Sequence, residues 1–93
     1  MQTYFMFGYY TPSSVREINE KRTENAVNII QGNGGKVQSM HALFGEIDLV
    51  FVVEFDDNKQ AAQTSLRLSK VTGITFKTTP AFSIEDFDRI AGE

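Results

Sequence analysis

The hydrophobic residues recur at two different spacings along the chain, and these spacings predict an alternation of strands and helices. Four stretches rich in aromatic and β-branched residues are predicted to be strands, at residues 3–10, 36–43, 47–55 and 74–79. Helical spacing follows the first and the third stretch, and a short third helix begins at Ser83, with Asp86 three residues later. The predicted order is therefore strand, helix, strand, strand, helix, strand, helix.

The first helix has two possible starting points in the sequence. Thr11 caps it with Pro12 at the first helical position, or Ser14 and Glu17 form a capping box. In both cases the glycine-rich residues 32–35 end the helix, because glycine accepts the left-handed conformation of a C-terminal cap. One apolar stripe is expected along it, formed by Val15, Ile18, Ala26, Ile29 and Ile30.

The second long helix is predicted between residues 56–58, which offer N-caps, and Gly73, which ends it. Helical spacing places three residues in one line on its surface and three more beside that line. The line contains Ala62, Leu66 and Ser69, and the flanking residues are Ala61, Leu68 and Val71.

This order of elements is that of the ferredoxin-like folds, in which two strand–helix–strand units interlock. We therefore predict an α+β domain of the βαββαβ type with a short C-terminal helix. Its four-stranded antiparallel sheet should carry both long helices on one face. No linker or low-complexity segment divides the sequence, so residues 1–93 are predicted to form a single domain.

The strand at residues 47–55 does not alternate, because five apolar residues run unbroken from Leu49 to Val53. A two-residue turn to the preceding strand would divide the side chains of both strands between two faces. The bulky set, which we place under the helices, is Leu49, Phe51, Val53 and Phe55 with Met40 and Ala42. The mixed set, left on the open face, is Asp48, Val50, Val52 and Glu54 with Ser39, His41 and Leu43.

The open face of this sheet still contains apolar side chains that need a cover. A second copy of the chain, packed face to face, would bury them and would enclose a pocket between the two sheets. A chain of 93 residues also has a thin core of its own, so an interface would add to its stability. We therefore expect a homodimer.

Composition and charge narrow the range of functions. The chain has no cysteine and one histidine, which excludes disulfides and thiolate chemistry and leaves too few ligands for zinc, so no metal or cofactor is expected. A net charge of −3 lacks the basic excess of a nucleic-acid binder. We see neither a basic leader nor an apolar stretch of ~20 residues, and we expect a cytoplasmic protein with no membrane partner.

Several segments together resemble the GYD-domain family. They are TYFMFGYYTPSS near the start, GGKVQS, GEID followed by LVFVVE, and the closing TTPAFS, and their order spans roughly residues 3–90. The resemblance implies a ferredoxin-like subunit of a dimeric α+β barrel, in a family whose members largely lack an assigned function. The family pattern is Gly, Tyr and Asp around the hairpin; Gly45 and Asp48 match it, whereas Ile47 stands in the place of the tyrosine.

His41, the one histidine, is the strongest candidate for chemistry near neutral pH. With the two-residue turn it faces Val50 and lies beside Asp48 on the open face. We expect His41 and Asp48 to bind the polar end of a ligand, with Ser39 and Glu54 nearby. In the simpler interpretation, His41 makes a hydrogen bond within an interface and Asp48 binds backbone N–H groups of the turn.

Tyr4 and Tyr10 are expected to meet the apolar part of that ligand, although ordinary core packing explains them more simply. Residues 32–35 end a helix and enter a strand, which is the reverse of a phosphate-binding loop.

Two functions remain, beside a purely structural role for the dimer. The first is a small-molecule-binding or sensory homodimer with a cavity between its sheets. The second is a small cofactor-free enzyme of the monooxygenase or isomerase type, with His41 as general base, an idea that rests on analogy of fold. The first is favoured because the sequence offers pocket-forming residues and a single plausible proton-transfer group.

Overall fold

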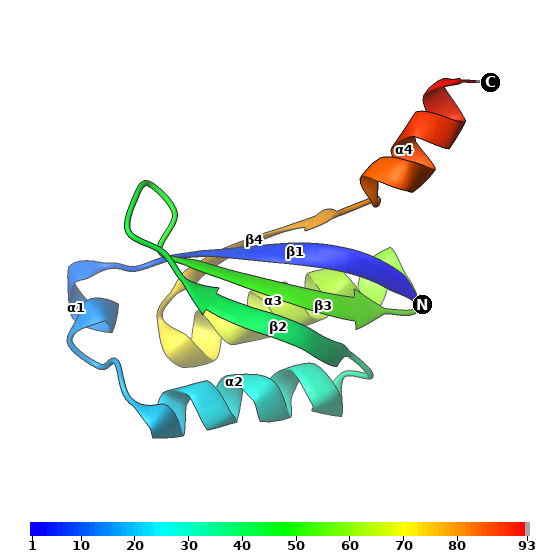
Figure 1. Ribbon diagram of the computed structural model, residues 1–93. Coiled ribbons are helices and arrows are strands. Elements are labelled where there is room, and N and C mark those ends of the chain that lie inside the picture. Colours follow the sequence, from blue (N-terminus) through cyan, green and yellow to red (C-terminus); the bar gives the residue numbers. More distant parts are fainter. Residues whose placement is uncertain (93) are drawn as a thin grey trace.

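The computed structural model describes residues 1–92, and it consists of one sheet with helices packed on one of its faces (Figure 1). The strands are β1 (Gln2–Tyr9), β2 (Lys36–Ala42), β3 (Leu49–Phe55) and β4 (Thr75–Pro80). The helices are α1 (Pro12–Val15), α2 (Glu20–Gly32), α3 (Asn58–Thr72) and α4 (Ile84–Ala91). All strand pairs are antiparallel, in the order β2-β3-β1-β4. The predicted ferredoxin-like α+β fold is confirmed.

The single helix predicted after β1 is two helices in the structure. α2 begins afresh at Glu20 because Asn19 caps it: the side-chain Oδ1 of Asn19 accepts a hydrogen bond from the backbone N–H of Arg22 at 2.9 Å. The part of the predicted stripe that α2 carries does face the core, and Ala26 and Ile30 are buried there.

α1 is a single turn that starts at the first of the two predicted caps. Thr11 and Ser14 each accept a hydrogen bond from the other's backbone N–H, at 3.0 and 2.7 Å. The alternative capping box of Ser14 with Glu17 is therefore wrong. Because the chain turns between α1 and α2, Val15 and Ile18 are 46% and 58% exposed and do not extend the apolar stripe.

α3 faces the sheet with a different side from the predicted one. Its buried residues are mostly small or polar: Ala61, Thr64, Ser65, Leu68 and Thr72. Thr64 and Thr72 donate to backbone carbonyls one turn earlier, at 2.8 and 2.6 Å, so their hydroxyls are bonded inside the core. Leu66 and Val71 are more than half exposed, and Ala62 is exposed as well. Ala62 and Leu66 of the predicted line therefore face solvent, whereas two of the predicted flanking residues, Ala61 and Leu68, face the core together with the bonded hydroxyl groups.

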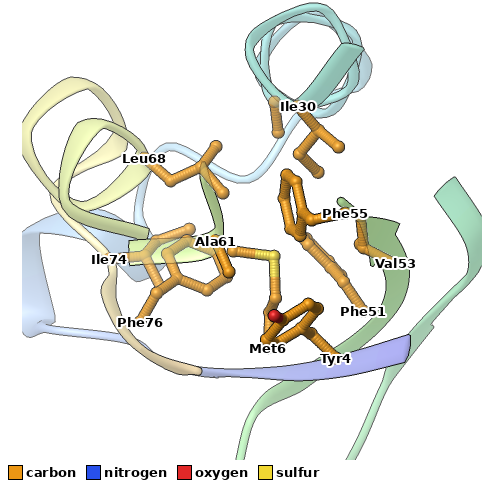
Figure 2. Close-up of a cluster of buried hydrophobic side chains, with 11 residues drawn as sticks. Tyr4, Met6, Ile30, Phe51, Val53, Phe55, Ala61, Leu68, Ile74 and Phe76 are labelled. Atoms are coloured by element: carbon orange, nitrogen blue, oxygen red, sulfur yellow. The ribbon is translucent and has the colours of Figure 1, made fainter. Parts of the chain in front are cut away.

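The core lies between the sheet and the two long helices (Figure 2). Phe51, Val53 and Phe55 of β3 point into it, and none of the three is more than 5% exposed. In Figure 2 they lie below Ile30 of α2 and beside Leu68 of α3. The prediction that the bulky set of β3 packs under the helices is confirmed.

β2 and β3 pair in the predicted register, with His41 opposite Val50. The turn between them is longer than predicted. The N–H of Leu43 donates to the carbonyl of Asp48 at 2.8 Å, and residues 44–47 form the loop beyond this pair. Since the loop is longer by an even number of residues, the parity of the two strands is unchanged and the assignment of faces holds.

The predicted C-terminal helix is present as α4, and Ser83 caps it by accepting a hydrogen bond from the N–H of Asp86 at 3.1 Å. α4 extends beyond the end of β4 and stands apart from α2 and α3 (Figure 1). None of its residues is buried. Among residues 1–92, every helix is too short or too polar to span a membrane.

Candidate ligand-binding site

The face of the sheet opposite the helices is apolar at its centre. The strand register places five large side chains of β1 and β3 there: Phe5, Phe7, Tyr9, Val50 and Val52. Each is partly covered by its neighbours, and the rings of Phe5 and Phe7 meet edge to face with centroids 6.1 Å apart. These five residues are called the open face below.

Polar groups border the open face. Ser39 and exposed His41 lie opposite Val52 and Val50, as predicted. Glu54 accepts a hydrogen bond from the side-chain amide of Gln38, which sits at an irregularity in the pairing of β2 with β3. The border therefore contains His41, Ser39 and Glu54, but Glu54 is engaged by a neighbour on its own sheet.

Tyr4 is far from this border. It is 1% exposed and lies in the core, and its hydroxyl donates to Oδ1 of Asn58 at 2.6 Å. Burial, and then the negative charge of Asp57, raise the pKa of the Tyr4 hydroxyl above its usual value. The prediction that Tyr4 meets a ligand on the open face is wrong, because alternate residues of β1, starting with Tyr4, face the helices.

Asp48 has a structural role, because it binds the backbone at the end of β1. Its Oδ2 accepts a hydrogen bond from the backbone N–H of Tyr10 at 2.8 Å, and its own N–H donates to the carbonyl of Gly8 at 3.0 Å. The carboxylate thus satisfies a backbone donor, as the simpler interpretation expects, but the donor belongs to the end of β1 rather than to the turn. This contact fastens the hairpin loop to the neighbouring strand.

A cavity of about 190 Å³ lies on the helix side of the sheet, beside the first turns of α2. Its walls are mainly apolar and are formed by Ala26, Met40, Leu49, Phe51, Ile74 and Phe76. Its polar lining comes from Tyr10, Asn19, Arg22, Thr23, His41 and Thr72. No aspartate or glutamate lines it within residues 1–92. Of the six residues predicted for a site, Tyr10 and His41 are in the lining; His41 belongs to the edge strand β2, and the register places its side chain on the open face.

Arg22 supplies the permanent positive charge of this cavity. Its Nη1 donates to the carbonyl of Ser14 at 2.5 Å, and its guanidinium carbon lies 5.6 Å from the centre of the Tyr10 ring. Within residues 1–92, no carboxylate is within ion-pair distance of Arg22. The ion pair found among these residues joins Arg89 to Asp86 in α4. Because a guanidinium has five N–H donors, Arg22 keeps donors for another partner.

The sequence did contain a signal for Arg22. It precedes Ala26 by four residues, and Ala26 precedes Ile30 by four, so the charged residue continues the buried line of α2 toward its N-terminus. A charged residue in line with core residues, rather than on the solvated side, marks a position worth testing.

The described residues contain no group of three or more histidine, aspartate or glutamate side chains that could bind a metal ion. The cavity is an apolar pocket that has hydrogen-bonding groups and the positively charged side chain of Arg22 at its border.

Several solved structures share the fold. LrpA, the leucine response regulatory protein of Mycobacterium tuberculosis, superposes with a TM-score of 0.63 at 14% identity; the match covers 88% of this chain and 51% of LrpA, so this chain spans about half the length of that regulator. FFRP-DM1 gives 0.62 at 24% identity, covering 88% of this chain and 100% of that one. The 30S ribosomal protein S6 of Thermotoga maritima gives 0.57 at 24% identity, with 99% and 98% covered. At these identities the likeness concerns the fold alone.

No curated protein matches the chain. A family model does: the GYD domain matches residues 4–91, which is nearly the whole sequence. This match includes the hairpin that contains Gly45, Ile47 and Asp48. The chain belongs to the GYD-domain family.

Proposed function

We propose that the protein is a homodimer that binds a small, partly apolar molecule in the cavity between α2 and the sheet. The observation that supports this most directly is the cavity itself, in which apolar walls are combined with a few polar groups. An engineered apolar cavity of about 150 Å³ takes up benzene. A cavity of about 190 Å³ is therefore large enough for a ligand built around one ring.

The lining favours binding over catalysis. No carboxylate lines the cavity within residues 1–92, and the strand register places the His41 side chain on the open face, so the cavity lining offers no acid–base pair for proton transfer. LrpA, which shares the fold, is named for a response to leucine, and this agrees with a sensory role for the present chain.

The open face supports the dimer. Phe5, Phe7 and Val52 form an apolar surface that a second sheet, packed about 10 Å away, would bury. α2 and α3 already cover the other face of the sheet, so a second copy of the chain would cover the open face. We also predict a second pocket, between the two sheets of the assembled dimer.

Thermal denaturation with benzamide, a neutral one-ring probe, tests the proposed pocket. We expect a rise of several degrees in Tm at ten times the Kd, because a ligand that binds only the folded state stabilises it. Ala42→Trp should abolish the rise, since Ala42 lines the cavity and a tryptophan there would occupy part of its volume. Ala62→Trp, on the exposed side of α3, is the matched control.

Two results would contradict the proposal. If neither benzamide nor benzoate changes Tm, the cavity is not a binding site for one-ring molecules. If Ala42→Trp binds benzamide as well as the unmodified chain does, binding occurs elsewhere.

A further inference from the structure

We propose that the natural ligand of the cavity is a small anion with an apolar body, in particular an aromatic or branched monocarboxylate, and that Arg22 binds its charged group. This inference rests on the proposed function and adds the chemical class of the ligand. It follows from the charge of the lining and from the way in which the Arg22 side chain is fixed.

The cavity lining has a positively charged side chain and no negatively charged one within residues 1–92. The positive charge is permanent, because Arg22 carries it. Arg22 has no protein carboxylate within ion-pair distance in that part of the chain. Two parallel N–H groups of a guanidinium match the two oxygens of a carboxylate, so a ligand carboxylate would complete this site.

The Arg22 side chain is also held in place before any ligand arrives. The Ser14 carbonyl accepts one of its hydrogen bonds at 2.5 Å, and the Tyr10 ring lies beside the guanidinium. A side chain that is already ordered loses little conformational entropy when it binds. The apolar body of the ligand would meet Phe51 and Phe76, whose ring centroids are 5.3 Å apart.

Benzoate and benzamide form a matched pair of probes, because they have nearly the same shape and differ in charge. Titration calorimetry at pH 7 should show that benzoate binds roughly tenfold or more tightly than benzamide, since hydrogen bonds to a charged group are about twice as strong as neutral ones. Arg22→Gln should remove this preference, so that benzoate and benzamide then bind with similar affinity. Lys21→Gln, which changes an exposed neighbour outside the cavity lining, should keep the preference.

The outcomes separate this inference from the proposed function. If benzamide binds as tightly as benzoate, or if Arg22→Gln retains the preference, the assignment of an anionic ligand to Arg22 is overturned while the pocket remains. If neither probe binds, the proposed pocket itself is overturned. Arg22→Lys guards against a folding defect: it keeps the charge, and it should retain part of the preference for benzoate.

A separate observation concerns the C-terminal helix, and from it we infer that α4 packs against a second copy of the chain. Four large apolar side chains lie on or just before α4: Phe82, Ile84, Phe87 and Ile90. They are 56–73% exposed, although three of them share one side of the helix. α4 stands beyond the ends of the strands, away from the core of its own chain (Figure 1).

The area of the open face supports a second contact between subunits. A face of four strands spaced about 4.8 Å apart and about seven residues long measures roughly 19 by 23 Å. This flat footprint, about 440 Å², is smaller than the ~800 Å² of accessible surface that each partner buries in a stable interface of standard size. A helix with an uncovered apolar side would enlarge the interface toward that value.

The charges are complementary as well. Asp86 and Asp88 flank the apolar side of α4, and Glu85 lies behind it. By the strand register, Lys77 lies at the β4 edge of the open face, and Lys36 lies at the opposite, β2 edge, where it faces Glu54. We therefore place α4 of each subunit against the β4 edge of its partner's open face, where an acidic flank of α4 meets Lys77.

Phe87→Asp and Arg89→Ala test this contact. Both lower the net charge by one, but Phe87 lies on the apolar side of α4 and Arg89 on the opposite side. Sedimentation equilibrium should show that Phe87→Asp raises the dimer Kd by tenfold or more, whereas Arg89→Ala leaves it within about threefold.

An unchanged dimer Kd in Phe87→Asp would overturn the role of α4 while leaving a dimer through the open face intact. The same holds if Phe87→Asp lowers Tm equally at all protein concentrations without changing the dimer Kd, because α4 would then fold back on its own chain. A chain that is monomeric at all concentrations would overturn both the role of α4 and the proposed dimer.

Discussion

Tyr4 is a core side chain with a polar end, and its environment depends on pH. The hydroxyl donates to Asn58 at 2.6 Å, and burial followed by the charge of Asp57 raises its pKa. The neutral form is therefore favoured by folding. A group with a raised folded-state pKa of this kind contributes stability that is fully present below its unfolded pKa of about 10 and is lost as the pH rises above it.

We expect Tyr4→Phe to lower the free energy of unfolding by about 1 kcal/mol at pH 7, because the hydrogen bond to exposed Asn58 is replaced by one from water. Above about pH 10 the variant should lose less stability than the unmodified chain, since it lacks the titrating hydroxyl. Urea unfolding at several pH values measures both effects. Tyr9→Phe, on the open face, is the control; equal alkaline losses in the two variants would contradict this account.

Phe51 tests the assignment of the two faces of β3. It is 5% exposed and packs against Phe76, so Phe51→Ala should lower the free energy of unfolding by about 3–5 kcal/mol. Phe44→Ala, at the fully exposed tip of the hairpin loop, should change it by less than about 0.5 kcal/mol. A loss below about 1 kcal/mol for Phe51→Ala in urea melts would show that Phe51 does not lie in the core.

At the level of elements, the segment that connects α2 to β2 is tightly packed at Gly35 but has free space at Gly32. A Cβ atom on Gly35 would lie 2.6 Å from a ring carbon of Phe55 and 2.7 Å from a methyl group of Ile30. A Cβ on Gly32 would meet no atom within 4 Å. The two positions therefore form a matched pair three residues apart.

We expect Gly35→Ala to destabilise the fold by about 1–3 kcal/mol through overpacking. Gly32→Ala should be neutral or stabilising by up to about 1 kcal/mol, because alanine is the better helix former in the last turn of α2. Thermal and urea unfolding of both variants provide the comparison. Equal stabilities would mean that the contact between the start of β2 and the core is looser than described.

The sequence predicted the type and order of the elements, but not where one helix became two. Asn19 is polar and lies within an apparently continuous helical pattern. Periodicity alone therefore did not show that it is the N-cap of a new helix, α2. The buried side of α3 was missed for a related reason. Thr64 and Thr72 look polar in sequence, yet each hydroxyl is bonded to its own helix.

The faces of the hairpin were predicted correctly through a turn of the wrong length. Residues 44–47 extend the turn by an even number of residues, and the pairing of His41 with Val50 depends on parity alone. The candidate site was predicted less well. Alternation along β1 places Tyr4 under the helices, and the cavity depends on how α1 and α2 are joined, which local patterns do not specify.

At the scale of the whole molecule, the open face leads to an expected mass. The chain weighs 10.5 kDa, so light scattering at micromolar concentration should give about twice that value. Val52→Asp should shift the mass toward the monomer, because it places a charge among the apolar side chains of the open face. Leu66→Asp, on the exposed side of α3, should remain dimeric. A stable monomer of the unmodified chain would contradict the proposed assembly.

The two faces of the sheet offer two different places for a ligand, and methyl NMR distinguishes them in one titration. Met40, Leu49 and Ile74 line the cavity under the helices, whereas Val50 and Val52 lie on the open face. With benzoate added to the unmodified chain, we expect saturable shifts of the Met40, Leu49 and Ile74 methyl signals and little change at Val50 and Val52. Shifts confined to Val50 and Val52 would place the ligand between the sheets instead, and would contradict the central claim that the cavity beside α2 is the binding site.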